Sequence, residues 1–193
     1  MSRPLTMPLV LLALASLAAM MLSVGVGSVS VAPGDIGAVI LGEGSNLQRT
    51  LVLELRLPRT LSAFATGGLL AVAGALMQVL LRNPLADPYV LGLSGGAAVG
   101  ALFAMLAGLG GLMISGSAFA GALLATLMVF GLAHGTGSWT PSRLLLTGVV
   151  VAAGWGAVIT LMLAISPAQR LPGMLYWLMG DVSYARTPWP ALA

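Results

Sequence analysis

The amino-acid sequence predicts an all-α fold, a bundle of helices that crosses a lipid bilayer several times. Of its 193 residues, 59% are hydrophobic and only 7% are charged, whereas soluble domains carry about 25% charged residues. The apolar residues form uncharged runs of about 20, the length that crosses roughly 30 Å of hydrocarbon as a helix. Prolines, glycines and charges collect between these runs and indicate turns. A soluble protein with a large core is disfavoured, since so few charges could not cover its surface.

Five runs predict complete transmembrane helices, and the first residues of a sixth follow them. The first run, residues 9–31, comes after a polar lead with one charge, Arg3. A cleaved signal peptide is the alternative for this run, but signal cores are usually only about 7–15 residues long. We expect a single transmembrane domain, 1–193, that is the N-terminal half of a longer protein whose C-terminal part is absent. The other spans are predicted at residues 58–81, 89–107, 113–133 and 144–165, with the start of the sixth at 189–193.

Two segments between the spans are predicted to carry short helices. Residues 32–55 contain the glycines, proline and acids of an extramembrane loop, with an amphipathic helix near residues 36–41. Pro58 suits the first turn of the next span, where its missing N–H needs no partner. Residues 168–180 are too short to cross a bilayer and place a tyrosine beside a tryptophan, as is typical of a membrane interface. They predict a short interfacial helix after the fifth span.

Two polar corners share one capping pattern. The segment RNPLADP, residues 82–88, contains two prolines, and each forces the residue before it away from helical geometry. Asp87 then suits an N-cap, with Pro88 at the first helical position. Thr140 and Pro141 repeat this arrangement before the fifth span. Each corner is therefore predicted to start the helix that follows it.

Small residues recur every four positions in three of the spans. One stripe is Gly92, Gly96 and Gly100, and the others lie at positions 67, 71, 75 and 148, 152, 156. In lipid, helices associate by close packing through such small residues. The stripes therefore predict helix packing, and the one that follows the 82–88 corner is also a candidate hinge.

The spans carry no group that does chemistry. The chain has no cysteine, and its single histidine, His134, cannot form a histidine cluster. Ionisable residues inside a membrane usually mark ion pathways or proton relays, and these runs contain essentially none. We therefore expect no catalysis, no cofactor and no metal site. A phosphate-binding Walker A loop needs a lysine, which the chain lacks, so an ATPase would be another chain. Scattered arginines without a basic stripe argue against nucleic acid.

The stretch from residue 55 to residue 100 resembles a known family. Its LRLPRTL start and its GALMQVLLRNPLADPYVLGLSGGA portion resemble the FecCD-type permeases, the membrane subunits of ABC importers for iron-siderophores, haem and cobalamin. Further along, TPSRLLLTGV resembles the entry to that family's fifth helix, and LYWLMGDV resembles its W-x-x-G segment after that helix. A paired glutamine is common in the family where this chain has Met77 and Gln78.

The resemblance implies a ten-helix permease subunit for iron-siderophore-type chelates in the bacterial inner membrane. Its partners would be a second permease copy, cytoplasmic ATPase subunits and a periplasmic substrate-binding protein. Cobalamin, haem and metal-ion importers are alternatives within transport, and a membrane assembly subunit without transport is the alternative outside it. The family topology implies a cytoplasmic amino terminus, with the corners 83–88 and 134–143 inside and residues 32–58 and 166–188 outside. Five of the eight arginines would then lie outside, against the positive-inside rule.

The resemblance also assigns roles to individual residues. Arg56 and Arg59 match external arginines that dock the binding protein, and lipid-headgroup anchoring is the alternative. Helix capping and turn formation are the alternatives for two segments that match cytoplasmic gates. The gate residues are Asn83, Pro84 and Leu85 in the first corner, and Thr140, Pro141 and Ser142 at the start of the pore-lining fifth helix.

Overall fold

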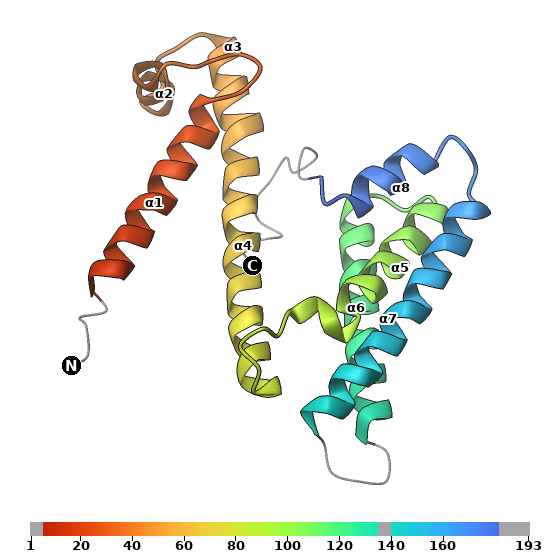
Figure 1. Cartoon of the computed structure of the whole chain (residues 1–193). Coiled ribbons are helices and arrows are strands. Elements are labelled where there is room, and N and C mark those ends of the chain that lie inside the picture. The colour runs from red at the N-terminus through yellow and green to blue at the C-terminus, as the bar shows by residue number, and fades with distance from the viewer. Residues whose placement is uncertain (1–5, 135–139, 182–193) are drawn as a thin grey trace. The chain divides into compact units, whose positions relative to one another are not determined.

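The structure is a computed structural model that describes residues 6–134 and 140–181. All regular elements in these two ranges are helical (Figure 1), which agrees with the predicted fold class. Four helical runs in them are long and apolar enough to cross a membrane: Thr6–Gly25, Asn46–Leu81, Gly111–His134 and Pro141–Ala164. The predicted turn at 135–139, the polar loop from 182 and the start of a sixth span at 189–193 lie outside the described residues, as do Arg3 and Arg186.

The chain divides into two compact units. The first ends at Leu69 and the second covers Leu70–Asp181. In the first unit, α1 (Thr6–Gly25) is followed by α2 (Pro33–Ile40), and α2 confirms the short helix predicted near residues 36–41. A continuous helical run then begins at Asn46; it consists of α3 (Asn46–Arg49), the π-helical turn η1 (Thr50–Arg56) and α4 (Leu57–Leu81).

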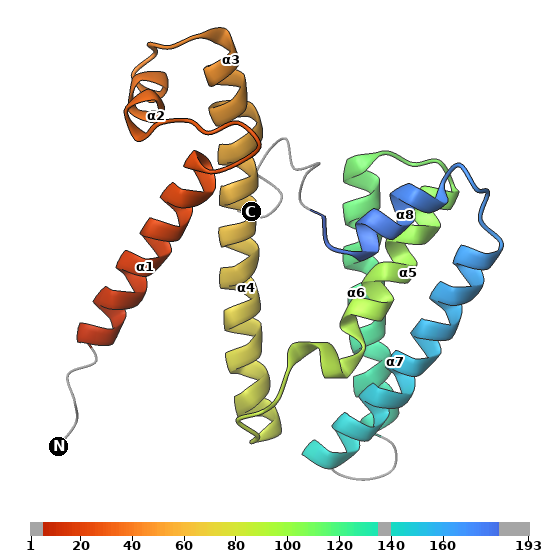
Figure 2. The same cartoon turned by 45° about the horizontal axis from the view of Figure 1, so that its top comes forward.

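Four valines form the core of the first unit. Val24 lies in the last turn of α1, Val31 in the loop, Val39 in α2 and Val52 in η1, and all four are buried together. Figures 1 and 2 show α1 approaching the long helical run at the end next to α2 and α3 and diverging from it further down. The core therefore holds the C-terminal end of α1 in place, while most of α1 exposes apolar side chains.

The second predicted span begins earlier than residue 58, so the loop predicted through residue 55 is wrong after Asn46. A capping box starts this helix: Ser45 Oγ accepts a hydrogen bond from the Gln48 backbone N–H (3.3 Å), and Gln48 Oε1 accepts one from the Ser45 N–H (2.9 Å). Pro58 then lies inside a helix, where it would ordinarily clash with the carbonyl four residues earlier. The turn before it is a π-helix, in which the Leu57 N–H donates to the Val52 carbonyl. This wider turn gives the proline ring room.

The second unit begins within α4, at Leu70, and continues with a short 3-10 turn and four further helices. These are η2 (Pro88–Leu91), α5 (Leu93–Leu106), α6 (Gly111–His134), α7 (Pro141–Ala164) and α8 (Leu171–Leu178). Helix α5 packs against both α6 and α7, and α8 lies against the C-terminal part of α5 (Figures 1 and 2). The buried residues of α5 are small apart from one leucine: Gly96, Ala98, Ala101, Leu102 and Ala104.

The third predicted span, residues 89–107, is wrong as one unbroken helix. Gly92 has φ +70°, a left-handed conformation that separates η2 from α5. Glycine adopts this conformation without the steric cost that other residues meet. The remaining helix, α5, has 14 residues, or about 21 Å at 1.5 Å per residue, which is shorter than a bilayer core.

The last two complete spans follow the prediction closely. Helix α6 covers the predicted 113–133 with two extra residues before it and one after. Helix α7 starts at Pro141 rather than residue 144 because Thr140 caps it, as the cap-then-proline pattern indicates. A short helix after the fifth span is present as α8, although its place at a membrane interface stays a prediction.

Candidate functional site

Arg56 is bonded to the end of α1 instead of pointing into open space. Its Nη1 donates to the carbonyls of Val24 and Gly25, both at 3.0 Å, and its Nη2 donates to the carbonyl of Val29. The last carbonyls of a helix have no partner within the helix. In lipid, each such unsatisfied group costs several kcal/mol. Arg56 therefore closes α1 and fixes the loop that follows it.

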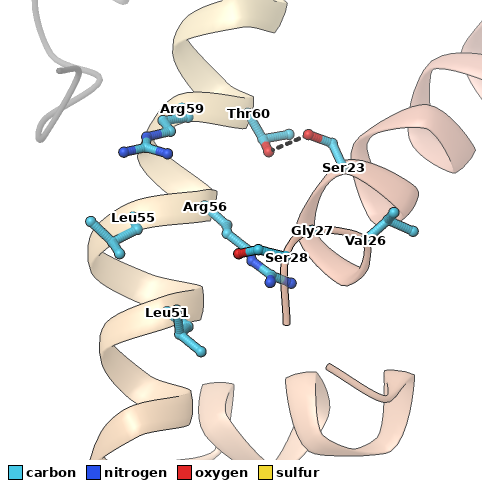
Figure 3. A pocket seen from close by; sticks show the side chains of 9 residues that line it. All are labelled: Ser23, Val26, Gly27, Ser28, Leu51, Leu55, Arg56, Arg59 and Thr60. Atoms are coloured by element: carbon cyan, nitrogen blue, oxygen red, sulfur yellow. Dashed lines mark hydrogen bonds between the residues drawn. The ribbon is translucent and has the colours of Figure 1, made fainter. Parts of the chain in front are cut away.

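The loop after α1 passes so close to Arg56 that a side chain at residue 27 would displace the guanidinium. A Cβ atom on Gly27 would lie 2.7 Å from Nη2 of Arg56 and 3.0 Å from its Cζ. Figure 3 shows the Arg56 side chain reaching across from η1 to this loop, beside Gly27 and Ser28. The guanidinium is thus partly enclosed by backbone, and Arg56 is partly buried.

Arg59 lies one helical turn further on, and no hydrogen bond from its side chain to the end of α1 is observed in the described part of the chain. Its Nε is buried and has no hydrogen-bond partner among the described residues. It lines a half-open pocket of about 260 Å³ between the end of α1 and the helix that carries both arginines. Ser23 and Thr60 bridge the two helices at this pocket through a 2.9 Å hydrogen bond between their hydroxyls. The lining residues are Ser23, Val26, Gly27, Ser28, Leu51, Leu55, Arg56, Arg59 and Thr60.

The first predicted gate segment is a tightly bonded turn. The Arg82 N–H donates to the Val79 carbonyl and the Asn83 N–H to the Gln78 carbonyl, which is the bonding of a Schellman helix end. Arg82 itself has φ +48°, where a glycine would be less strained. Asn83 Oδ1 accepts from the Leu85 N–H at 2.9 Å, and the Leu85 side chain is 89% exposed.

Each corner that contains a predicted gate segment also caps the helix that follows it. Asp87 Oδ1 accepts from the Tyr89 N–H at 2.7 Å, so Asp87 caps η2 with Pro88 behind it. Thr140 Oγ1 accepts from the Arg143 N–H at 3.3 Å and caps α7. Pro141 takes the first helical position, and Ser142 is exposed. The capping role of these corners is therefore observed, whereas a gating role stays a proposal.

The two gate segments lie at the same end of the second unit (Figures 1 and 2). One buried cluster contains Ala86 of the first corner, Leu144 from the first turn of α7 and Ala133 from the last turn of α6. Leu81 and Leu91, which flank the first corner on either side, belong to the same cluster. The two gate segments are thus coupled through shared packing. The sequence motifs from which the segments were predicted did not indicate this common core.

The glycine stripe lies at two different helix contacts. A Cβ on Gly92 would lie 3.2 Å from the backbone N of Ala152 in α7. Gly96 and Gly100 instead face α6: added Cβ atoms would lie 2.5 Å from the Cβ of Ala125 and 2.8 Å from the carbonyl carbon of Ser117. No side chain fits at these two positions without moving α5 away from α6. The 67 position, by contrast, faces open space within this chain.

Two contacts were not foreseen from the sequence. Arg170 Nη1 donates to the carbonyl of Met105 at 3.2 Å and to that of Leu106, so it closes α5 as Arg56 closes α1. Trp155 of α7 packs against Gly95, where an added Cβ would lie 2.6 Å from the tryptophan Cβ. A glycine beside a tryptophan has no sequence signal of its own, and the Arg170 contact spans 64 and 65 residues.

The polar groups of the described residues can be sorted by what they bond to. Within residues 6–134 and 140–181 there is no group of three His, Asp or Glu side chains that could hold a metal ion. The conspicuous polar groups instead close helices, cap helices or line the pocket at Arg59.

Comparisons with known proteins identify relatives over nearly the whole chain. Residues 12–191 match the model of the FecCD transport family. The chain is 38% identical to the achromobactin transport system permease protein CbrC of Dickeya dadantii, over 86% of this chain and 48% of that one. It is 39% identical to the vitamin B12 import system permease protein BtuC of Escherichia coli, over 89% of this chain and 51% of that one.

A solved structure has a similar fold. It is described as an inward-facing conformation of a metal-chelate type ABC transporter, and it superposes with a TM-score of 0.74 at 25% identity. The match covers 94% of this chain and 53% of the other. In each of these comparisons the chain spans about half the length of its relative.

Proposed function

This chain belongs to the FecCD transport family, and we propose that it is a membrane-spanning permease subunit of an ATP-driven importer for iron-siderophore-type chelates. The family match over residues 12–191 carries the proposal, together with a permease relative named for the transport of achromobactin.

We propose that the two corners act together as the cytoplasmic gate. Asn83, Pro84 and Leu85 would move with Thr140, Pro141 and Ser142, because Ala86 and Leu144 beside them share one buried cluster. Packed clusters switch between arrangements more readily than they deform. The almost fully exposed Leu85 offers an apolar contact for a cytoplasmic partner. Gly92, next to the first corner, would serve as the hinge, since its left-handed backbone already separates η2 from α5.

The partners follow from the same proposal. A second permease copy would complete the passage, two cytoplasmic ATPase subunits would drive it, and a periplasmic binding protein would deliver the chelate. The amino terminus would lie in the cytoplasm of a bacterium, with the chain in the inner membrane. Substrate would pass by alternating access, with α7 lining part of the route.

Uptake measurements test the proposed substrate class. The gene and its neighbouring transport genes would be expressed in a bacterium that lacks its own chelate and cobalamin permeases. We expect uptake of radioactive iron supplied as an iron-siderophore chelate, and no uptake of cobalamin labelled with radioactive cobalt. The reverse result would favour the second candidate, cobalamin transport, which the 39% identity to a vitamin B12 permease supports. Uptake of neither, with the protein present in the membrane, would favour a non-transporting subunit.

We propose that Arg56 and Arg59 dock the binding protein, with unequal contributions. Arg56 is held by three backbone carbonyls and would mainly fix the loop and add positive charge. Arg59 has a buried Nε without a partner in the described residues and would meet a carboxylate of the binding protein. Charges at the edge of an interface act chiefly on the association rate.

Replacement of Arg59 tests this assignment. Arg59→Glu in the full-length protein should lower the affinity for the binding protein by about tenfold or more, mostly by slowing association. Arg49→Glu is the matched control, because Arg49 lies on the same helical run but is exposed and does not line the pocket. Surface plasmon resonance at two salt concentrations would measure both rate constants. Equal affinity for the Arg59→Glu variant and the unchanged protein would remove Arg59 from the docking surface.

A further inference from the structure

We propose that the pocket at Arg59 is a binding site for the phosphodiester group of a membrane phospholipid. The site lies where α1 ends, between Ser23 and Ser28 on one side and the helix from Leu51 to Thr60 on the other (Figure 3). The inference does not depend on the docking of a binding protein. It concerns the permease chain alone, before any partner is present, and a carboxylate of the binding protein would have to displace the lipid to reach Arg59.

Uncompensated positive charge is the first observation that points to an anion. Two arginines, Arg56 and Arg59, line the pocket, and no Asp or Glu does. The bonds of Arg56 go to neutral carbonyls, so they satisfy its N–H groups but leave its charge in place. The pocket therefore carries two positive charges with no negative partner in its lining.

An unused donor is the second observation. Buried polar atoms in proteins nearly always have a hydrogen-bond partner, and one without a partner often marks an ion or a water. The buried Nε of Arg59 is such an atom among the described residues. Ser23 and Thr60 share a single hydrogen bond, so one of the two hydroxyl hydrogens is left to donate. Arginine binds phosphate through charge-assisted bonds, and a nearby hydroxyl can complete the contact.

The lining also has the mixed polarity of a phospholipid near its headgroup. Val26, Leu51 and Leu55 contribute an apolar wall beside the two arginines. The volume, about 260 Å³, is below the roughly 300–1,000 Å³ of pockets that enclose drug-sized ligands. It can hold a headgroup phosphate but not acyl chains. These would lie outside along α1, where Met21 and Leu22, next to Ser23, are each 64% exposed.

The position along α1 favours a lipid over free phosphate. Helix α1 is an apolar candidate span that ends at Gly25. The pocket residues lie at that end: Ser23 is in the last turn of the helix, and residues 26–28 come directly after it. The end of a spanning helix lies near the headgroup layer. A phosphodiester attached to a lipid is therefore already concentrated at the pocket, whereas inorganic phosphate has to come from solution.

Native mass spectrometry of the full 193-residue chain in detergent tests the proposal. Phosphatidylglycerol and diacylglycerol with the same acyl chains would be titrated separately, so that the phosphate is the main difference between them. We expect phosphatidylglycerol to bind at least about tenfold more tightly, and Arg59→Gln to remove most of that difference. Arg49→Gln is the control with the same loss of charge outside the pocket, and it should bind as the unchanged chain does.

A second variant and a competitor keep the result interpretable. Leu55→Trp fills the pocket and leaves both arginines in place, so it should also weaken phosphatidylglycerol binding, while circular dichroism checks that each variant is folded. Equal binding of the two lipids, or no loss in either Arg59→Gln or Leu55→Trp, would overturn the proposal. Displacement of the phospholipid by millimolar inorganic phosphate would overturn the assignment to a lipid and favour free phosphate as the ligand.

Discussion

Arg56 and Arg170 perform the same task at the ends of two apolar helices. Arg56 donates to carbonyls at the end of α1, and Arg170 donates to carbonyls at the end of α5. A helix that ends near lipid has less water available for its last carbonyls than a helix in a soluble protein. A long side chain with several donors can replace that water, and its positive charge is favoured at the negative end of the helix dipole.

This role gives a reason for the distribution of arginines. In the proposed orientation both Arg56 and Arg170 lie on the outer side, where the positive-inside rule predicts few positive charges. An arginine bound to backbone carbonyls contributes to folding, and that contribution can outweigh a modest topological preference. A glycine in the loop after the closed helix lies close to each arginine. Gly27 lies against Arg56, and Gly108, with φ +75°, lies near Arg170.

Removal of the Arg170 donors should destabilise the second unit. Arg170→Leu leaves the carbonyls of Met105 and Leu106 without this partner. We expect a loss of about 1–2 kcal/mol, because Arg170 is exposed and water can partly replace it. For a chain of this size that corresponds to a fall of roughly 2–8 °C in the melting temperature. Thermal unfolding in detergent micelles, followed by circular dichroism, would measure it.

Arg143→Leu is the comparison for this experiment. Arg143 is also exposed, but it stands in the first turn of α7, where a positive charge faces the positive end of the helix dipole. Its replacement should leave the melting temperature unchanged or slightly higher. A similar decrease in both variants would mean that charge removal in general, and not the closure of α5, destabilises the protein.

At the scale of helices, the contact between α5 and α6 depends on glycines that touch backbone. A methyl group added to Gly100 would lie 2.8 Å from the Ser117 carbonyl carbon, and the carbonyl oxygen is closer still. Backbone atoms cannot rotate away as a side chain can. The two helices approach this closely because α5 has glycines at both Gly96 and Gly100, and α6 has Gly121 opposite Gly96.

A single methyl group should therefore separate α5 from α6. Gly100→Ala is expected to destabilise the protein by about 1–3 kcal/mol, the usual range for overpacking. Gly116→Ala, in α6 where a Cβ meets open space within this chain, should have the opposite sign. Alanine there raises helix stability by roughly 0.5–1 kcal/mol. Chemical or thermal unfolding of the two variants side by side would show whether packing or helix propensity decides, and a stable Gly100→Ala variant would contradict the close contact.

The sequence predicts those helical features that depend on neighbouring residues. Apolar runs located α6 and α7 closely, whereas the run at residues 9–31 placed the end of α1 beyond its observed end at Gly25. The pairs of a capping residue with a proline located the starts of η2 and α7. These signals are local, since a cap bonds to an N–H two or three residues away. The stripe of glycines likewise indicated the face on which this helical segment packs closely against its neighbours.

The rest could not be read from the sequence because it depends on distant contacts or on backbone geometry. Pro58 looked like a helix start, but a π-helical turn accommodates it within a longer helix. Gly92 looked like part of a packing stripe, but its positive φ ends η2. Arg56 reaches carbonyls 27 to 32 residues away, so its role at the end of α1 has no local pattern.

At the scale of the whole molecule, the proposed function requires the two kinds of site to face opposite sides of the membrane. The gate corner would lie in the cytoplasm, and the segment with α2 and the arginine pocket would lie outside. Each side of the chain offers an exposed leucine suitable for a label. Leu85 in the gate corner is 89% exposed, and Leu41, directly after α2, is 81% exposed. The chain has no cysteine, so one introduced thiol would be the only one present.

Cysteine labelling at these two positions tests the orientation. In intact cells whose outer membrane has been made permeable, a membrane-impermeant maleimide should label Leu41→Cys and leave Leu85→Cys unlabelled. In inside-out vesicles the pattern should reverse, because only the cytoplasmic corner then faces the reagent. Full labelling of both variants after detergent treatment checks that each thiol is reactive. If Leu85→Cys is labelled from the periplasmic side, the chain has the opposite orientation, and both the gate and the docking assignments fail together, as a single inversion would move each to the wrong compartment.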